Sequence, residues 1–166
     1  MTLYKINALK LYNIVMKYYS YEDFKNDTIA LIKKVKEFDP QAMIAIARGG
    51  LTLSHTMAEG LDIRQVQSIR TELYDKSKKR DSLDIFDTCK LQNVNRVLVV
   101  DDIADSGDTL KAVMEYLSDK YKDIEFRSAT LFYKRTSVYE PHFWINEATE
   151  WIDFFWERDF IGQKSI

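Results

Sequence analysis

The residues best suited to chemistry lie in one stretch, Asp101 to Thr109, which reads Asp-Asp-Ile-Ala-Asp-Ser-Gly-Asp-Thr. It follows an aliphatic run and precedes a helical pattern, so its backbone N–H groups can line the start of a helix. Such N–H groups suit a terminal phosphate monoester, and the hydroxyls of Ser106 and Thr109 add further donors. Gly107 lets the backbone approach an anion closely. The stretch does not match a Walker nucleotide loop, because no Gly-Lys-Ser/Thr follows.

Two neighbouring acids, Asp101 and Asp102, would face the same pocket and repel a phosphate. They fit the site if they accept hydrogen bonds from sugar hydroxyls or hold a cation, so a sugar phosphate with magnesium satisfies every group. The alternative is that the acids cap the next helix. One acid is enough for a cap, and with Asp105 the stretch has three within five residues.

A second junction of the same kind contains Arg48, Gly49 and Gly50. In an open parallel sheet, ligands bind outside the carboxyl ends of the strands, where both junctions would lie. Three of the chain's five glycines lie at these two junctions. Single glycines are usually tight turns, but two such turns, each followed by a helix, favour a shared phosphate site.

Hydrophobic patterning predicts the elements that must position these junctions. Helices are expected from Ser20, which would cap the first one with Asp23 in its first turn, from Leu51 and over 110–117. Strands are expected at 43–47, 63–69, 96–100 and 126–133. Gly60 is expected to end the second helix as a left-handed cap. Strands that alternate with helices predict an α/β fold with a parallel sheet flanked by helices.

The stretch 70–90 has few core residues, and we interpret it as a long mobile loop of the kind that forms lids. Its cluster 76–80, Lys-Ser-Lys-Lys-Arg, either attracts pyrophosphate or is an ordinary solvated charge run.

Length and composition indicate a single domain over residues 1–166. The contents of 46% hydrophobic and 30% charged residues are ordinary for a soluble globular protein. The net charge of −2 argues against nonspecific electrostatic binding of nucleic acid. Cys89 is the single cysteine, and no apolar run approaches the roughly 20 residues that span a bilayer. We therefore expect a cytoplasmic protein that does not insert into membranes.

The segment Val97 to Thr109 resembles the PRPP-binding signature of type I phosphoribosyltransferases, where PRPP is phosphoribosyl pyrophosphate. The signature has four aliphatic residues, two acids, two variable or apolar residues, and Asp-Ser/Thr-Gly-x-Thr. From about Asp39 to Glu157 the chain also resembles the short bacterial xanthine-guanine branch of that family in order and length. The resemblance implies a parallel sheet flanked by helices, a flexible lid over 70–90, and a hood over about 143–166 with N-terminal contributions.

The implied reaction transfers the phosphoribosyl group of PRPP to a 6-oxopurine base: guanine, xanthine or hypoxanthine. Its products are a purine nucleoside 5′-monophosphate and pyrophosphate, its cofactor is Mg²⁺, and its setting is purine salvage. Relatives are homodimers or homotetramers. The sequence does not rank the three bases, and we expect backbone carbonyls of the hood to make that choice.

Residue by residue, the resemblance implies a PRPP site made of Arg48, Gly49, Asp101, Asp102, Ala104, Ser106, Gly107, Asp108 and Thr109. The metal would be held by Asp101, Asp102 and Glu157. The Ala47–Arg48 peptide bond is expected to be cis, and Ala47 replaces the serine that relatives commonly have. Asp108 replaces the usual Gly, Lys or Arg.

For the base, the resemblance implies that Asp105 is the general base near purine N7. Lys134 would recognise the oxygen at C6, since an ammonium has donors only and disfavours the amino group of adenine. Trp151 would stack on the purine and the Ile152 main chain would read its edge. The aromatic tail around them could instead be core or subunit interface.

On the lid, Tyr74 matches a family tyrosine, whereas Leu73 replaces the serine beside it. An alternative to an enzyme is a PRPP-sensing regulator that keeps the signature and catalyses nothing. The basic cluster 76–80 is the one feature in its favour, because the chain has no spare helix-turn-helix domain.

Overall fold

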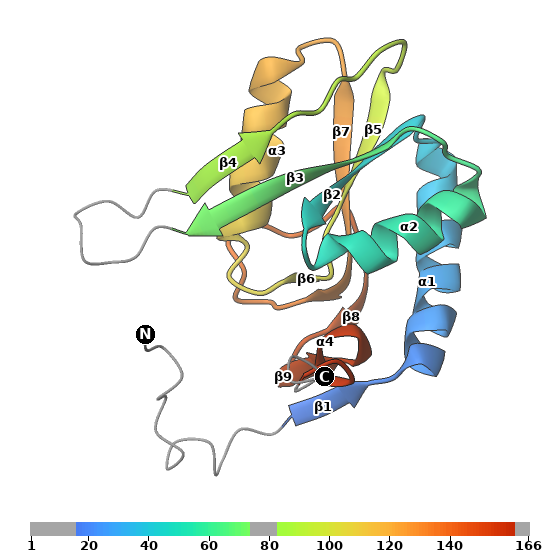
Figure 1. Cartoon of the computed structure of the whole chain (residues 1–166), viewed down its shortest axis with the longest axis vertical. Coiled ribbons are helices and arrows are strands. Elements are labelled where there is room, and N and C mark those ends of the chain that lie inside the picture. The colour runs from blue at the N-terminus through green and yellow to red at the C-terminus, as the bar shows by residue number, and fades with distance from the viewer. Residues whose placement is uncertain (1–15, 74–82, 162–166) are drawn as a thin grey trace, which may run out of the picture.

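The computed structural model describes residues 16–73 and 83–161, and its centre is a mostly parallel seven-stranded sheet (Figure 1). Its strands are β2 (Ala42–Ala47), β3 (Val66–Leu73), β4 (Leu83–Asp87), β5 (Arg96–Val100), β6 (Ile103–Ala104), β7 (Glu125–Tyr133) and β8 (Phe143–Glu147). The strand order is β4-β3-β2-β5-β7-β6, and β8 pairs with β7. Only the β3–β4 pairing is antiparallel. The sheet confirms the predicted α/β class.

Helices cover both faces of this sheet (Figure 1). They are α1 (Tyr21–Val35), followed by a 3-10 turn η2 (Lys36–Phe38), α2 (Gly50–Leu61) and α3 (Asp108–Lys120). The short α4 (Phe155–Arg158) lies apart from this sheet, beside β9 (Trp151–Phe154) (Figure 1). In β5, Leu98 and Val100 pack into the core under α1 and α2, whereas Val97 and Val99 pack into the core under α3. This two-sided burial explains why the strand is aliphatic throughout.

The start of α1 confirms the predicted cap. The Ser20 hydroxyl accepts a hydrogen bond from the Asp23 backbone N–H at 3.1 Å, and the Asp23 carboxylate accepts one from the Ser20 N–H. This reciprocal pair satisfies two backbone donors that the first turn would otherwise leave without a partner.

The predicted end of α2 is wrong. Gly60 lies inside the helix, and Asp62 is the left-handed cap with φ of 54°. Gly60 faces α1, where an added Cβ would overlap the Cδ1 of Ile32. The glycine therefore serves helix packing rather than helix termination.

The interpretation of 70–90 as one loop is wrong at its flanks, because β3 extends to Leu73 and Leu83–Asp87 forms β4. Polar contacts add to the apolar packing of Ile85 and Cys89 against the core. The Asp87 carboxylate is almost fully buried and accepts hydrogen bonds from Lys120, from the Tyr116 hydroxyl and from the Cys89 N–H. Residues 74–82, which include Tyr74 and the basic cluster, lie outside the described residues.

A separate two-stranded parallel sheet lies beside the main one. It pairs β1 (Met16–Tyr19) with β9 (Trp151–Phe154), so an early segment and a late segment form one unit with α4, which we call the hood. β8, by contrast, extends the main sheet. The Tyr19 ring packs edge-on against Phe132 of β7 and thereby ties the hood to the sheet.

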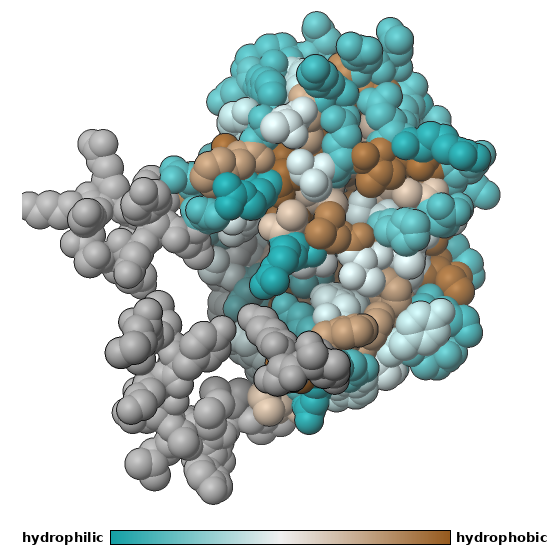
Figure 2. All heavy atoms as spheres, in the orientation of Figure 1, coloured by the Kyte–Doolittle hydropathy of each residue, from teal (hydrophilic) through white to brown (hydrophobic). Residues whose placement is uncertain are grey.

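One face of the described part of the molecule is mainly polar (Figure 2). Hydrophilic residues cover most of the face seen in Figure 2, broken by small apolar patches. No helix in 16–73 or 83–161 is both long and apolar enough to cross a bilayer.

Candidate active site

The two glycine junctions meet at the carboxyl ends of β2 and β5, as expected. A Cβ on Gly50 would overlap the Val100 carbonyl oxygen, and one on Gly49 would lie 2.5 Å from an Asp102 carboxylate oxygen. Any side chain at either glycine would push the junctions apart. The Ala47–Arg48 peptide bond is cis, which confirms that expectation.

The loop between β6 and α3 encloses a small cavity. Gly107 adopts φ of 85° at the start of α3, and the Ser106 hydroxyl accepts a hydrogen bond from the Asp108 N–H at 3.3 Å. The cavity measures about 120 Å³ and is lined by Asp101, Ile103, Ala104, Asp105, Ser106, Gly107, Thr109 and Leu110. The start of a helix and the hydroxyls of Ser106 and Thr109 suit a phosphate here.

A segment after β7 supports this loop from behind, and sequence reasoning missed it. The Val138 N–H donates to the Ser106 carbonyl at 2.8 Å, and the Lys134 N–H donates to the Ala104 carbonyl at 3.1 Å. The Ser137 hydroxyl lies where a Gly107 Cβ would be. No motif marks Ser137 or Val138, because their importance comes from a contact distant in sequence.

The adjacent acids Asp101 and Asp102 have raised pKa values. Burial is the main cause for both, and the neighbouring Asp102 charge adds to the effect on Asp101. For Asp102, burial together with the charge of Glu157 raises the pKa to about 7. Two carboxyls that are costly to ionise together gain from a cation or from sugar hydroxyls.

The donor set fits Mg²⁺, which prefers carboxylate oxygens and keeps several ligands from water and substrate. Asp102 and Glu157 are near enough for their charges to interact. Over the described ranges, no group of three acidic, histidine or cysteine side chains forms a preassembled metal site. Substrate oxygens would therefore complete the coordination.

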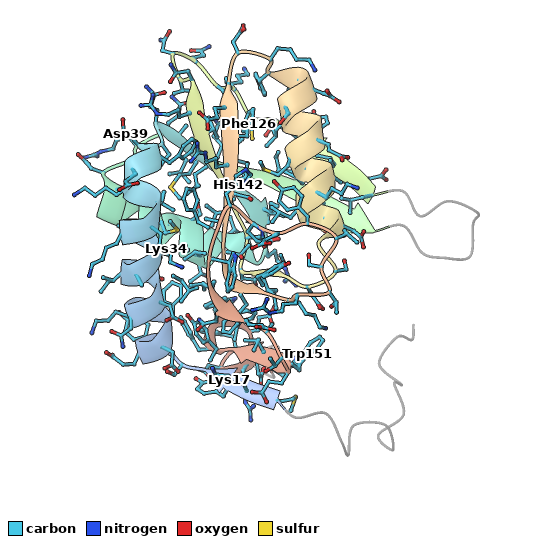
Figure 3. The ribbon with its side chains drawn as sticks, turned by 180° about the vertical axis from the view of Figure 1, so that it is seen from behind. Lys17, Lys34, Asp39, Phe126, His142 and Trp151 are labelled. Atoms are coloured by element: carbon cyan, nitrogen blue, oxygen red, sulfur yellow. The ribbon has the colours of Figure 1, made fainter. Side chains whose placement is uncertain are left out.

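A larger cavity of about 390 Å³ lies between the carboxyl edge of the sheet and the hood. It is lined by Asp102, Ile103, Asp105, Lys134, Ala148, Thr149, Glu150, Trp151, Ile152, Phe154 and Glu157. Trp151 is 61% exposed, whereas Ile152 and Phe154 are buried. Figure 3 shows Trp151 on the hood near Lys17, whose strand pairs with β9.

Within this cavity, the Lys134 ammonium contacts an Asp105 carboxylate oxygen at 2.9 Å. In a 6-oxopurine, the oxygen at C6 and N7 are neighbours on one edge of the ring. One cationic donor and one carboxylate side by side can therefore address both atoms of a single base.

A third cavity, of about 510 Å³, lies beside the first junction. It is lined by Arg48, Gly49, Leu51, Thr52, Trp156, Glu157, Phe160 and Ile161. Glu157 lines both this cavity and the one below Trp151. The structure thus brings the described candidate residues to three adjoining cavities, except Asp108, which is exposed and lines none of them. Tyr74 is the one candidate outside the described residues.

Comparison with known proteins gives consistent matches. The family model described as the phosphoribosyl transferase domain matches residues 17–159. The xanthine-guanine phosphoribosyltransferase of Idiomarina loihiensis is 28% identical over 120 residues, which cover 70% of this chain and 71% of the relative. That of Nitratidesulfovibrio vulgaris is 29% identical over 143 residues, which cover 84% of this chain and 83% of the relative.

Solved structures agree with these relatives. The xanthine-guanine-hypoxanthine phosphoribosyltransferase of Helicobacter pylori superposes with a TM-score of 0.85 and 38% identity, covering 92% of this chain and all of that one. A purine phosphoribosyltransferase from Pyrococcus horikoshii gives a TM-score of 0.76 and 28% identity, covering 85% of this chain and 93% of that one.

Proposed function

The chain belongs to the phosphoribosyltransferase family, and on that premise we propose that it transfers the phosphoribosyl group of PRPP to a 6-oxopurine base. The products are a purine nucleoside 5′-monophosphate and pyrophosphate, in purine salvage. The observation that supports this proposal most is the contact of Lys134 with Asp105, in a cavity that adjoins the phosphate-sized one.

Binding begins with the 5′-phosphate in the loop that precedes α3, where backbone N–H groups and the hydroxyls of Ser106 and Thr109 donate hydrogen bonds. Asp101 and Asp102 accept hydrogen bonds from the ribose hydroxyls. Fixing the 5′-phosphate and the ribose hydroxyls orients the anomeric carbon toward the cavity lined by Lys134 and Trp151, which we call the base cavity. This orientation lowers the entropic cost of the displacement.

The transfer breaks the bond from the anomeric carbon to pyrophosphate and forms one to the purine nitrogen, with inversion. Arg48 and the Gly49 N–H stabilise the departing pyrophosphate with fixed donors. The carboxylates of Asp101, Asp102 and Glu157 would hold Mg²⁺, which supplies charge neutralisation to the leaving group. Asp105 accepts the proton from N7, and the hood limits access of water.

Lys134 gives the site its preference for a carbonyl at C6. Its three N–H donors pair with an oxygen, whereas the amino group of adenine would present a donor to a donor. Trp151 offers an exposed aromatic face on which the purine can stack.

The proposal is tested with purified protein, PRPP and Mg²⁺, by following nucleotide formation with guanine, xanthine, hypoxanthine, adenine and uracil in turn. Conversion confined to the first three bases is expected. Uptake of PRPP in calorimetry without conversion of any base would identify a PRPP sensor instead. The loop between β6 and α3, which we call the phosphate loop, is assigned as the site of the 5′-phosphate. Absence of any PRPP or nucleotide binding would overturn that assignment.

The same preparation tests the expected assembly. As the resemblance implies, we propose a homodimer or homotetramer, and light scattering coupled to size-exclusion chromatography distinguishes these from a monomer.

A further inference from the structure

Glu150 lies in the base cavity without an assigned role. It belongs to the segment 148–152, which connects β8 to β9 of the hood and lines one side of that cavity, whereas Lys134 and Asp105 follow strands of the main sheet. Its side chain is half-buried, and within 16–73 and 83–161 no hydrogen bond or ion pair occupies its carboxylate. The carboxylate is therefore available to a ligand.

The proposed pose of the base fixes what Glu150 can meet, so the inference rests on the proposed function. Lys134 and Asp105 take the C6 oxygen and N7, and the ribose lies at the phosphate loop. C2 lies across the ring from N7, and its substituent then points away from both. The segment 148–152, which contains Glu150, also lines this cavity and can meet that substituent.

We propose that Glu150 determines specificity at C2 and favours guanine over hypoxanthine, and hypoxanthine over xanthine. Guanine presents two donors, N1–H and the 2-amino N–H, to the two acceptor oxygens of a carboxylate. Hypoxanthine presents N1–H alone. Xanthine presents N1–H beside a C2 carbonyl, so an acceptor oxygen faces an acceptor oxygen and specificity arises from repulsion as well as attraction.

The charge of the cavity acts in the same direction. Asp102 and Glu157 are assigned to the metal and Asp105 contacts Lys134, so among the described lining residues Glu150 carries the negative charge that no assigned partner offsets. Xanthine loses a proton more readily than the other two bases, and its anion is repelled by this lining. A bidentate pair discriminates by about 1–3 kcal/mol, which corresponds to roughly 5- to 150-fold in kcat/KM for guanine over xanthine.

The test is the isosteric variant Glu150→Gln, assayed for kcat/KM with the three bases. An amide offers one acceptor and one donor, which match N1–H and the C2 carbonyl of xanthine. We expect the xanthine-to-guanine ratio to rise by roughly 10-fold or more, through both a gain for xanthine and a loss for guanine. Glu150→Ala is expected to reduce the preference for guanine without a gain for xanthine.

Glu147→Gln is the matched control. Glu147 pairs with Arg135 at the end of β8 and does not line the cavity, so its loss removes a nearby charge without touching the base. An unchanged xanthine-to-guanine ratio in both Glu150 variants, or the same change in Glu147→Gln, overturns the assignment. If the wild-type protein converts no base, the proposed function itself fails and Glu150 loses its role with it.

Discussion

Asp105 has two roles in the proposed mechanism. Its carboxylate contacts Lys134 in the unliganded protein, and it would accept a proton from the purine during transfer. Asp105→Asn keeps an oxygen for Lys134 but removes the basic group. We expect kcat to fall by roughly 10²–10⁴-fold with little change in PRPP affinity. Steady-state kinetics and calorimetry measure the two effects, and equal losses in both would assign Asp105 to PRPP binding instead.

Asp102 makes the unliganded protein less stable as pH rises. Its folded pKa of about 7 lies above the ordinary value of 3.8, so between these values the folded protein holds a proton that the unfolded chain has lost. Its contribution to stability is therefore present below about pH 4 and is lost as pH rises to about 7.

Asp102→Asn removes this dependence. We expect the variant to be more stable than the wild type at pH 8, on the order of 1–3 kcal/mol in urea unfolding without ligand, and to bind PRPP poorly. If the difference in unfolding free energy between the variant and the wild type were the same at pH 8 as at pH 5, the raised pKa of Asp102 would be contradicted.

For individual residues, the sequence predicted the positions of the acids but not the contacts between side chains that are distant in sequence. Three acids within five residues are informative on their own, because that many exceed what a helix cap needs. The 2.9 Å contact of Lys134 with Asp105, and the support that Ser137 and Val138 give the phosphate loop, depend on β6 and β7 pairing. No local pattern encodes that pairing.

Among the elements, the loop before α3 depends most on one backbone conformation. Gly107 has φ of 85°, and a Cβ there would overlap the Ser137 hydroxyl and lie 2.8 Å from the Tyr139 nitrogen. Gly107→Ala is expected to raise KM for PRPP at least 10-fold and to lower stability by about 1–3 kcal/mol.

Gly60→Ala in α2 is the control for this change. Its Cβ would meet only the flexible end of Ile32, and alanine favours a helix, so KM for PRPP should stay unchanged. A similar rise of KM in both variants would show that general destabilisation, not the loop, causes the effect.

Element types were predictable where burial is two-sided or a cap is local. The aliphatic run of β5 and the Ser20–Asp23 cap are examples, and both are confirmed. The end of α2 was not, because Gly60 lies inside the helix against Ile32 of α1, and Asp62 is the cap. β4 was missed because Asp87 anchors it to α3 through polar contacts, which hydrophobic periodicity does not detect.

For the whole molecule, the phosphate loop belongs to the main sheet and the base wall belongs to the hood. Ligands that reach one or both should therefore protect different segments from hydrogen exchange. Ribose 5-phosphate is expected to protect the start of α3 alone. A purine nucleoside monophosphate should protect 148–154 and 16–19 as well, and protection of the hood by ribose 5-phosphate alone would contradict this division.

The fold class followed from the alternation of strands and helices, since right-handed crossovers leave few topologies for such a pattern. The pairing of β1 with β9 did not follow, because short four-residue strands far apart in sequence carry no mutual signal. The hood was expected only from the family resemblance.

The β1–β9 pairing also determines when the hood can fold during synthesis of the chain. The Tyr18 hydroxyl donates a hydrogen bond to Asp159, 141 positions later, so this contact of the hood forms only after residue 159 has left the ribosome. A nascent chain that has emerged as far as β7 already contains both glycine junctions, yet it lacks the wall against which a base is held. Premature termination after β7 would thus yield fragments that lack both this wall and the residues Ser137 and Val138, which support the loop before α3.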